Sequence, residues 1–194
     1  DGYRLAEKRC HTIDQDIAAV IPASTLQEVM RSLQDVSEDM TIFFDETQVC
    51  FWTADMEIIS RLIDGKFPDY RQLIPAKSET TITVKKADFA RITKVASLFA
   101  RESGGGITLL ASHEDSLLSI HSIASELGEN TSEASAQVTH DGQITLNSRY
   151  LIEALNVIDG DEVTFAFSGK LSPCIIRQDA KQTDYTHIIM PLKS

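Results

Sequence analysis

Cysteine is scarce in this sequence: Cys10, Cys50 and Cys174 are the only three among 194 residues. They are odd in number, widely spaced and without a CxxC pair, which argues against a disulfide framework or a cysteine-based metal site and favours a reduced, cytoplasmic setting. No apolar run approaches the roughly 18 residues of a membrane span, so we expect no membrane partner. The opening residues, DGYRLAEKRC, contain neither an apolar signal region nor a Met, which predicts that the chain begins inside a longer protein.

Basic side chains are outnumbered, with 18 Lys and Arg against 29 Asp and Glu, for a net charge of -11. This balance argues against a protein that coats nucleic acid on every face, but it allows a local basic strip on an acidic body. The hydrophobic content of 42% is typical of a soluble globular protein. A chain of this length can bury about 70% of the surface that it exposes when unfolded. It can therefore form a stable hydrophobic core without disulfides or bound metal ions.

Catalytic motifs are also missing. The glycine run at 104–106 lacks the GxGxxG spacing, no histidine pair has the HExxH spacing, and no serine lies in a GxSxG elbow. Cys174 follows a proline in an apolar strand, which favours a buried thiol over a nucleophile. The cluster His113, Glu114 and Asp115 lies between two alternating strands, where a polar triplet favours a hairpin turn. The alternative is a small α+β hydrolase or transferase that uses this cluster. We expect no catalytic residue, cofactor or metal ion.

What the sequence does contain is an internal repeat. Three segments share the order short strand, helix, three strands, and their helices begin near Ser24, Lys86 and Asn147, with Ser24, Thr25 and Asn147 as expected N-caps. Each helix has an apolar stripe at helical spacing. The stripes are Leu26, Val29, Met30 and Leu33; Phe89, Ile92, Ala96 and Phe99; and Leu151, Ala154, Leu155 and Ile158.

Strand-like runs follow each helix. Alternation is clear where Val163, Phe165 and Phe167 are interleaved with polar or small residues, the pattern of a sheet with one wet face. The pattern predicts an α+β fold. A single unit of one helix and four strands leaves much of its apolar surface exposed. Two such units side by side can bury that surface against each other. We therefore expect a complete domain over residues 72–194 and half of a preceding domain over residues 1–71.

Charge differs between the expected helices and the rest. Residues 24–34, 86–99 and 147–158 contain five basic and three acidic side chains, which leaves a net charge of -13 for the remaining sequence. If the helices share one side of the structure, that side is mildly basic and the sheet side repels polyanions.

Three segments resemble a known family. The opening DGYRLA, the linker LIDGKFPDYRQLIP (62–75) and the end YTHIIMPLKS, together with LNSRYLIEAL, are similar to the bacterial sliding clamp, the beta subunit of DNA polymerase III. The resemblance implies the DNA clamp fold, in which repeated βαβββ units place helices on an inner face and antiparallel sheets on an outer face. It implies a non-catalytic processivity factor of the DNA polymerase III holoenzyme, a nucleotidyltransferase, and a full-length ring homodimer around double-stranded DNA. This stretch alone is expected to be monomeric.

The family also has a hydrophobic groove that binds a short motif of the polymerase III alpha subunit, the clamp loader and other proteins. The residues that match this groove are Gly2, Tyr3, Arg4, Leu5, Pro68, Leu73, Asn147, Tyr150, Leu171, Pro173, Ile188, Ile189, Met190, Pro191 and Leu192. A plain core strand is the alternative for Ile188 and Ile189. Gln72, Gly104 and Ser194 depart from the residues common in the family at the edges of the groove.

Two further sets of residues follow from the resemblance. Arg31, Arg91, Lys94 and Arg149 are expected to face DNA and to contact phosphates without sequence preference. Leu98, Phe99, Glu126, Glu129 and Glu133 are expected at the interface that closes the ring.

Overall fold

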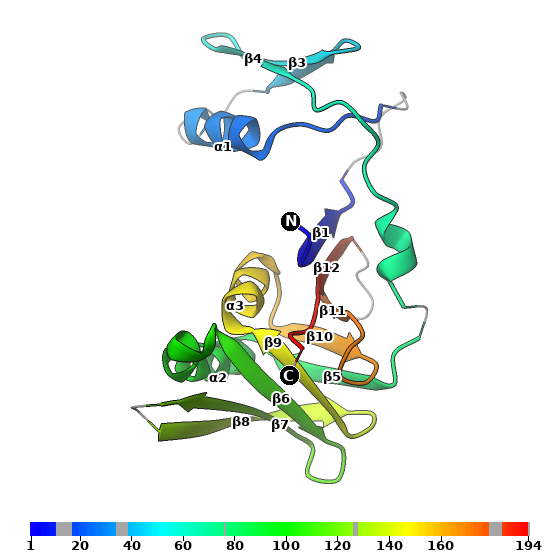
Figure 1. Ribbon diagram of the computed structural model, residues 1–194. Coiled ribbons are helices and arrows are strands. Elements are labelled where there is room, and N and C mark those ends of the chain that lie inside the picture. The colour runs from blue at the N-terminus through cyan, green and yellow to red at the C-terminus, as the bar shows by residue number, and fades with distance from the viewer. Residues whose placement is uncertain (11–16, 34–38, 76, 126–127, 179–183, 194) are drawn as a thin grey trace. The chain divides into compact units, whose positions relative to one another are not determined.

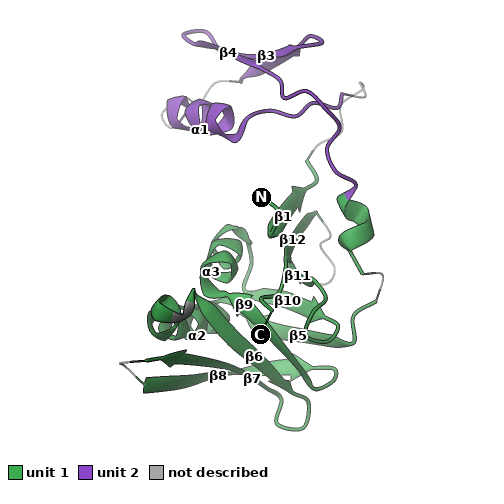
Figure 2. Cartoon of the chain, viewed as in Figure 1, with its two compact units in different colours: residues 1–11, 70–194 green, residues 12–69 purple. Residues whose placement is uncertain are grey.

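The computed structural model describes residues 1–10, 17–33, 39–75, 77–125, 128–178 and 184–193. Contacts divide the chain into unit 1, residues 1–11 with 70–194, and unit 2, residues 12–69 (Figure 2). The first residues of the chain therefore contact its second half.

The described residues of unit 1 form one antiparallel sheet with two helices and two short 3-10 turns (Figure 1). Its helices are α2 (Lys86–Phe99) and α3 (Ser148–Val157), and its turns are η1 (Tyr70–Leu73) and η2 (Ala100–Ser103). Its strands are β1 (Arg4–Lys8), β5 (Thr80–Lys85), β6 (Gly106–Ser112), β7 (Leu117–Ala124), β8 (Gly128–Val138), β9 (Gly142–Asn147), β10 (Glu162–Phe167), β11 (Cys174–Arg177) and β12 (Tyr185–Ile189). The strands pair in the order β1-β12-β11-β10-β5-β8-β7-β6-β9.

The expected repeat is present in unit 1, where β5-α2-β6-β7-β8 is followed by β9-α3-β10-β11-β12. The two helices contact each other and lie on the same side of the sheet (Figure 1). Strands β10 and β5 join the two copies into one sheet, with Phe165 opposite Ile82. The predicted α+β class is confirmed.

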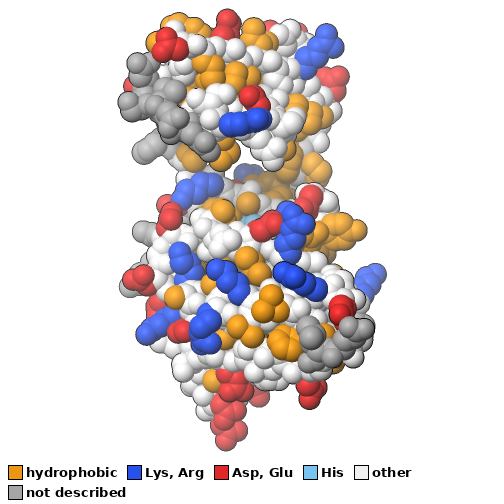
Figure 3. Space-filling view, turned by 90° about the vertical axis from the view of Figure 1, so that its left-hand side faces the viewer, with side chains coloured by type: hydrophobic (Ala, Val, Ile, Leu, Met, Phe, Trp, Pro, Cys, Tyr) orange, Lys and Arg blue, Asp and Glu red, His pale blue; other side chains and the backbone are white. Residues whose placement is uncertain are grey.

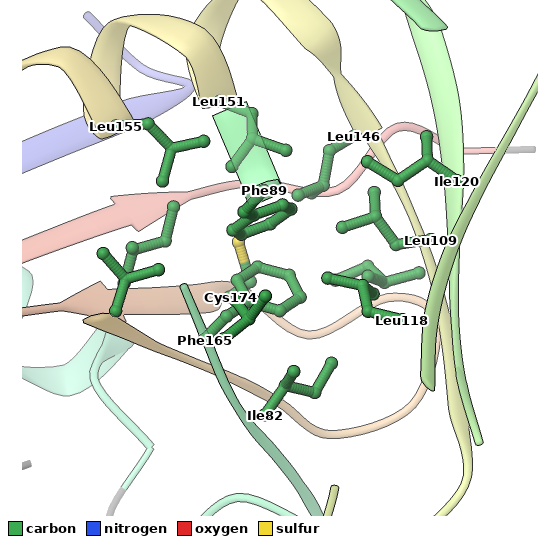
Figure 4. Packing of buried hydrophobic residues seen from close by; sticks show 14 of the residues in the cluster. Ile82, Phe89, Leu109, Leu118, Ile120, Leu146, Leu151, Leu155, Phe165 and Cys174 are labelled. Carbon is green, nitrogen blue, oxygen red and sulfur yellow. The ribbon is translucent and has the colours of Figure 1, made fainter. Parts of the chain in front are cut away.

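The helical stripes and the inward strand positions form the core between these layers. Phe89, Ile92 and Ala96 of α2 are buried, as are all four stripe residues of the third predicted helix. Figure 4 shows Phe89 and Phe165 packed beside Cys174. Cys174 is fully buried, as the sequence predicts, and burial raises the pKa of its thiol to about 12.

Unit 2 contains helix α1 (Ala23–Ser32) and a separate sheet with the strand order β2 (Thr41–Phe44), β3 (Gln48–Trp52) and β4 (Glu57–Arg61). Its core cluster is small and consists of Val29, Val49 and Phe51, with partly buried neighbours. One helix and three strands cover little apolar surface, which is why this core is small.

Two predictions for the first helix are wrong. Leu26 and Met30 are exposed, because the three strands of unit 2 cover only the Val29 side of the stripe. The helix is preceded by Pro22 and has no side-chain cap. The Thr25 hydroxyl instead pairs with the Ser60 hydroxyl at 2.8 Å, which ties the helix start to β4.

The Phe165 ring should be a main determinant of stability in unit 1. It is fully buried, and its centroid lies 5.8 Å from that of Phe89 and 5.4 Å from that of Phe167. We expect Phe165→Ala to lower the free energy of unfolding of unit 1 by about 3–5 kcal/mol, since it removes packing and leaves a cavity. Urea denaturation followed by far-UV circular dichroism measures this. The control Leu98→Ala, at an exposed position, should change it by less than about 1 kcal/mol; similar losses for both variants would contradict this view of the core.

Candidate functional site

Residues from the two ends of the chain meet at the pairing of β1 with β12. Arg4 is opposite Ile189 and Leu5 is opposite Ile188 in antiparallel register. Just beyond the ladder, the Met190 N–H donates to the Tyr3 carbonyl at 2.8 Å. These pairings bring residues 3–5 and 188–190, which are all predicted groove residues, side by side, although they are far apart in the sequence.

Arg4 is fixed on α3 by several contacts. Its guanidinium lies 4.5 Å from the centroid of the Tyr150 ring, a cation–π geometry, and it pairs with Glu153. Its Nε also donates to Asp1 at 2.8 Å. The pKa of Glu153 is lowered by a hydrogen bond from Arg149 and, to a smaller extent, by one from Arg4. The carboxylate therefore stays charged and holds both arginines.

Asn147 occupies the start of α3, as the sequence predicts. Its side-chain oxygen accepts from the Arg149 N–H at 3.0 Å, which caps the helix. Its amide donates to the Gly104 carbonyl at 3.4 Å. Gly105 has a φ of 83°, and a Cβ there would lie 3.2 Å from the Asn147 side chain, so glycine lets this loop approach the cap.

The remaining predicted groove residues of unit 1 differ in exposure. Met190, Pro191 and Leu192 are half-buried, so each presents part of its side chain at the surface. Leu171 is 71% exposed and Pro173 is half-buried. Ile188 and Ile189 are buried, at 2% and 0% exposure, which favours the alternative of a core strand for these two residues.

Turn η1 brings Leu73 into unit 1. The Tyr70 hydroxyl donates to Glu7 of β1 at 2.8 Å, and Leu73 is exposed three residues later. Gly2 is exposed at the start of the chain and has a φ of 91°. Pro68 belongs to unit 2 and is exposed.

The predicted DNA-facing residues lie on helices. Arg91 and Lys94 are on α2, Arg149 is in the first turn of α3, and Arg31 is on α1 of unit 2; all four are exposed. Figure 3 shows Lys and Arg side chains over the side of unit 1 where α2 and α3 lie.

Three of these four cations have an acidic partner on their own helix. Arg31 pairs with Glu28, Arg91 with Asp88 at 3.5 Å, and Arg149 with Glu153 at 2.8 Å. Within the described ranges, Lys94 has no such partner. Exposed pairs of this kind are weak and can exchange for phosphate at little cost.

The predicted ring-interface residues of unit 1 lie on α2 and β8. Leu98 is exposed and Phe99 half-buried at the end of α2, which packs against β8. Glu129 and Glu133 lie exposed on β8, and the Ser119 hydroxyl donates to Glu133 at 3.3 Å. Glu126 lies outside the described residues.

The cluster at residues 113–115 is the predicted turn between β6 and β7. Asp115 accepts from the Ser112 hydroxyl at 2.7 Å, and the His113 N–H donates to Asp141 at 2.7 Å. These side chains stabilise the hairpin. Across the described part of the chain, no group of three His, Cys, Asp or Glu side chains could hold a metal ion, and no helix is long and apolar enough to span a membrane.

Tyr185 and His187 form a hydrogen-bonded pair near Arg4, which the sequence did not predict. The Tyr185 hydroxyl and the His187 Nδ1 are 2.8 Å apart, and His187 is only 6% exposed. Both residues line a hollow of about 370 Å³, together with Arg4 and Glu153. The signal in the sequence is a histidine within an apolar strand, with a tyrosine two residues before it.

His187 should make the stability of unit 1 sensitive to acid. Burial has the largest effect on the pKa of His187 and lowers it. The nearby charge of Arg4 lowers it further, and the charge of Glu153 opposes this effect. Below the ordinary histidine pKa of about 6.5, the unfolded chain binds a proton at this residue that the folded chain does not, so stability falls as the pH drops. We expect His187→Gln to lose less stability than the wild type between pH 7 and pH 5, as measured by urea denaturation. His140→Gln, at an exposed position, should behave like the wild type; an unchanged pH dependence in His187→Gln would refute the assignment.

Two family models match the chain. The central domain of the DNA polymerase III beta subunit matches residues 1–69, and the C-terminal domain of the same subunit matches residues 71–193. The beta sliding clamp of Staphylococcus epidermidis is 32% identical over 198 residues, which cover 100% of this chain and 52% of that protein. The chain thus spans about half the length of the curated relatives it matches.

Solved structures of sliding clamps have the same fold. The DNA polymerase sliding clamp of Bacillus subtilis is 31% identical with a TM-score of 0.93, and the match covers 100% of this chain and 52% of that one. A Bartonella birtlesii sliding clamp bound to griselimycin is 26% identical with a TM-score of 0.91, covering 100% and 53%. Both the fold and the two family models show that this chain belongs to the DNA polymerase III beta subunit family, the bacterial beta sliding clamps.

Proposed function

We propose that this chain is part of a sliding clamp, a non-catalytic processivity factor of the bacterial replicative DNA polymerase. In the whole protein, a homodimeric ring would encircle double-stranded DNA in the cytoplasm and recruit partners through a peptide-binding groove. Membership of the family supports this role. The hydrolase or transferase alternative is not supported, because the residues on which it relied form a hairpin turn.

One observation carries the peptide-binding part of the proposal. The half-buried residues at 190–192 follow β12, and the Met190 N–H is hydrogen-bonded to Tyr3 at the opposite end of the chain. Apolar side chains that remain partly accessible next to polar anchors are typical of surfaces that bind short peptides. The Bartonella clamp bound to griselimycin supports a ligand site on this fold.

Within this surface, Tyr150 and Met190 have different roles. Tyr150 is half-buried and its ring is held by Arg4, so it offers a rigid aromatic face. Met190 is anchored through its backbone while its flexible thioether is free to adapt to an apolar side chain. The short peptide motif that binds this surface would belong to the polymerase III alpha subunit, the clamp loader and other clamp-binding proteins.

The DNA-facing part of the proposal depends on the helices of unit 1. On α2 and α3 four basic side chains outnumber two acidic ones, whereas the whole chain is strongly negative. A weakly positive inner side would hold the phosphates loosely and would let the ring slide. The acidic remainder of the chain would keep DNA from binding to the outside.

A peptide titration tests the proposed function. We expect the chain to bind a short hydrophobic clamp-binding peptide with a Kd in the micromolar range, and Met190→Ala or Tyr150→Ala to weaken binding by more than about tenfold, because both remove apolar contact at the centre of the surface. Isothermal titration calorimetry measures the affinity.

Leu110→Ala is the matched control, because this leucine is partly exposed on β6 and is not a groove residue. Its affinity should stay within about twofold of the wild type. Absence of peptide binding by the folded wild-type chain, or equal affinities for all variants, would contradict the proposal.

A further inference from the structure

A second hollow lies in unit 1, on the opposite side of the sheet from α2 and α3. It has a volume of about 210 Å³ and is lined by the linker residues Pro75, Lys77 and Ser78 and by sheet residues that include Thr164, Ile175 and Arg177. Val163 and Phe165 point into the core, so Thr164 between them points to the other side. None of its lining residues belongs to the predicted groove or to the DNA-facing set.

Two cations, Arg177 and Lys77, border this hollow. Arg177 lies directly opposite Thr164 in the ladder of β10 and β11, so their side chains are neighbours on one face. The Arg177 Nε donates to the Thr186 hydroxyl at 3.3 Å, which orients the guanidinium. Lys77 is exposed across from it. Neither cation forms an ion pair with any residue in the described ranges.

The rest of the lining is uncharged, and half of it is apolar, namely Pro75, Ala166 and Ile175. It includes the side chains of Ser78, Thr81 and Thr164, and no Asp or Glu. The Thr164 hydroxyl oxygen is shielded from solvent and has no hydrogen-bond partner among the residues described. A hydroxyl can both donate and accept, and a buried one without a partner calls for a water or an ion nearby.

Two carboxylates that are close in sequence to the lining residues do not line the hollow. Glu79 follows Ser78 and is exposed, and its N–H donates to the Ser168 hydroxyl at 3.1 Å. Glu162 lies two residues before Thr164, opposite Lys85 in the ladder, and lines a different hollow. The hollow itself therefore combines two positive charges with hydroxyl groups, in a chain whose net charge is -11.

We propose that this hollow binds one oxyanion group, a phosphate or a carboxylate. The planar guanidinium of Arg177 offers paired N–H donors that match two oxygens of such a group, and Lys77 supplies a second charge from the linker. Because Lys77 is on the segment that leads into β5 and Arg177 is on the sheet, a bound anion would tie the linker to the sheet. The oxyanion is either free in solution or carried by an acidic side chain of a partner.

A nuclear magnetic resonance titration of the 194-residue chain tests the site at constant ionic strength. With inorganic phosphate, we expect saturable shifts of the amides of Ser78, Thr164 and Arg177, with a Kd of about 1 mM. Arg177→Gln and Lys77→Gln should each weaken phosphate binding by about tenfold, because each removes a charged donor. Lys77 is exposed, so its variant keeps the test valid if Arg177→Gln does not fold.

Arg101→Gln is the charge-matched control, since Arg101 is exposed in η2, outside the hollow, and should leave the affinity within about twofold. A capped Asp-Asp dipeptide and its Asn-Asn counterpart distinguish the two sources of the oxyanion. If only the aspartyl dipeptide shifts these amides, a side chain is the preferred ligand; if only phosphate does, the ligand is a solute. Shifts that do not saturate with either probe, or equal affinities in Arg177→Gln, Lys77→Gln and Arg101→Gln, would overturn the proposal and leave water as the partner of Thr164.

Discussion

The pairing of β1 with β12 is the interaction on which the candidate site depends. It joins residues 4–8 to residues 185–189 in antiparallel register, so the chain start becomes the edge strand of the large sheet. Only in this register does Arg4 point toward α3, where it contacts Tyr150 and Glu153, while Leu5 points to the other face. A shift by one residue would exchange these two side chains between the faces.

The core of unit 1 supplies the rigidity that the groove needs. The buried apolar stripe of helix α3 packs into the core, and the Asn147 side chain caps the start of the helix. Tyr150 therefore has a defined position. The same helix carries Arg149 toward the side on which we propose that DNA passes. The peptide-binding and DNA-facing surfaces therefore share one element, and Glu153 contacts an arginine of each.

Local signals predicted the repeat, the positions of α2 and α3, the Asn147 cap and the turn at residues 113–115, because each depends on neighbours within a few residues. The β1–β12 pairing joins residues from the two ends of the chain, and only the resemblance to clamps placed them in one groove. The predicted cap at Thr25 failed for the same reason, since its hydroxyl pairs with the distant Ser60. Burial of Ile188 and Ile189 also depends on packing that periodicity does not report.

Amide hydrogen exchange in the free chain tests most directly whether the N-terminal strand is part of unit 1. The Met190 N–H donates to the Tyr3 carbonyl, and the Arg9 N–H donates to the Asp184 carbonyl at 2.7 Å, so these two amides report the two ends of the β1–β12 ladder. We expect both amides to be protected by at least about 100-fold relative to an unstructured peptide. Exchange of both amides at the unstructured rate, while the amides of β10 stay protected, would contradict it.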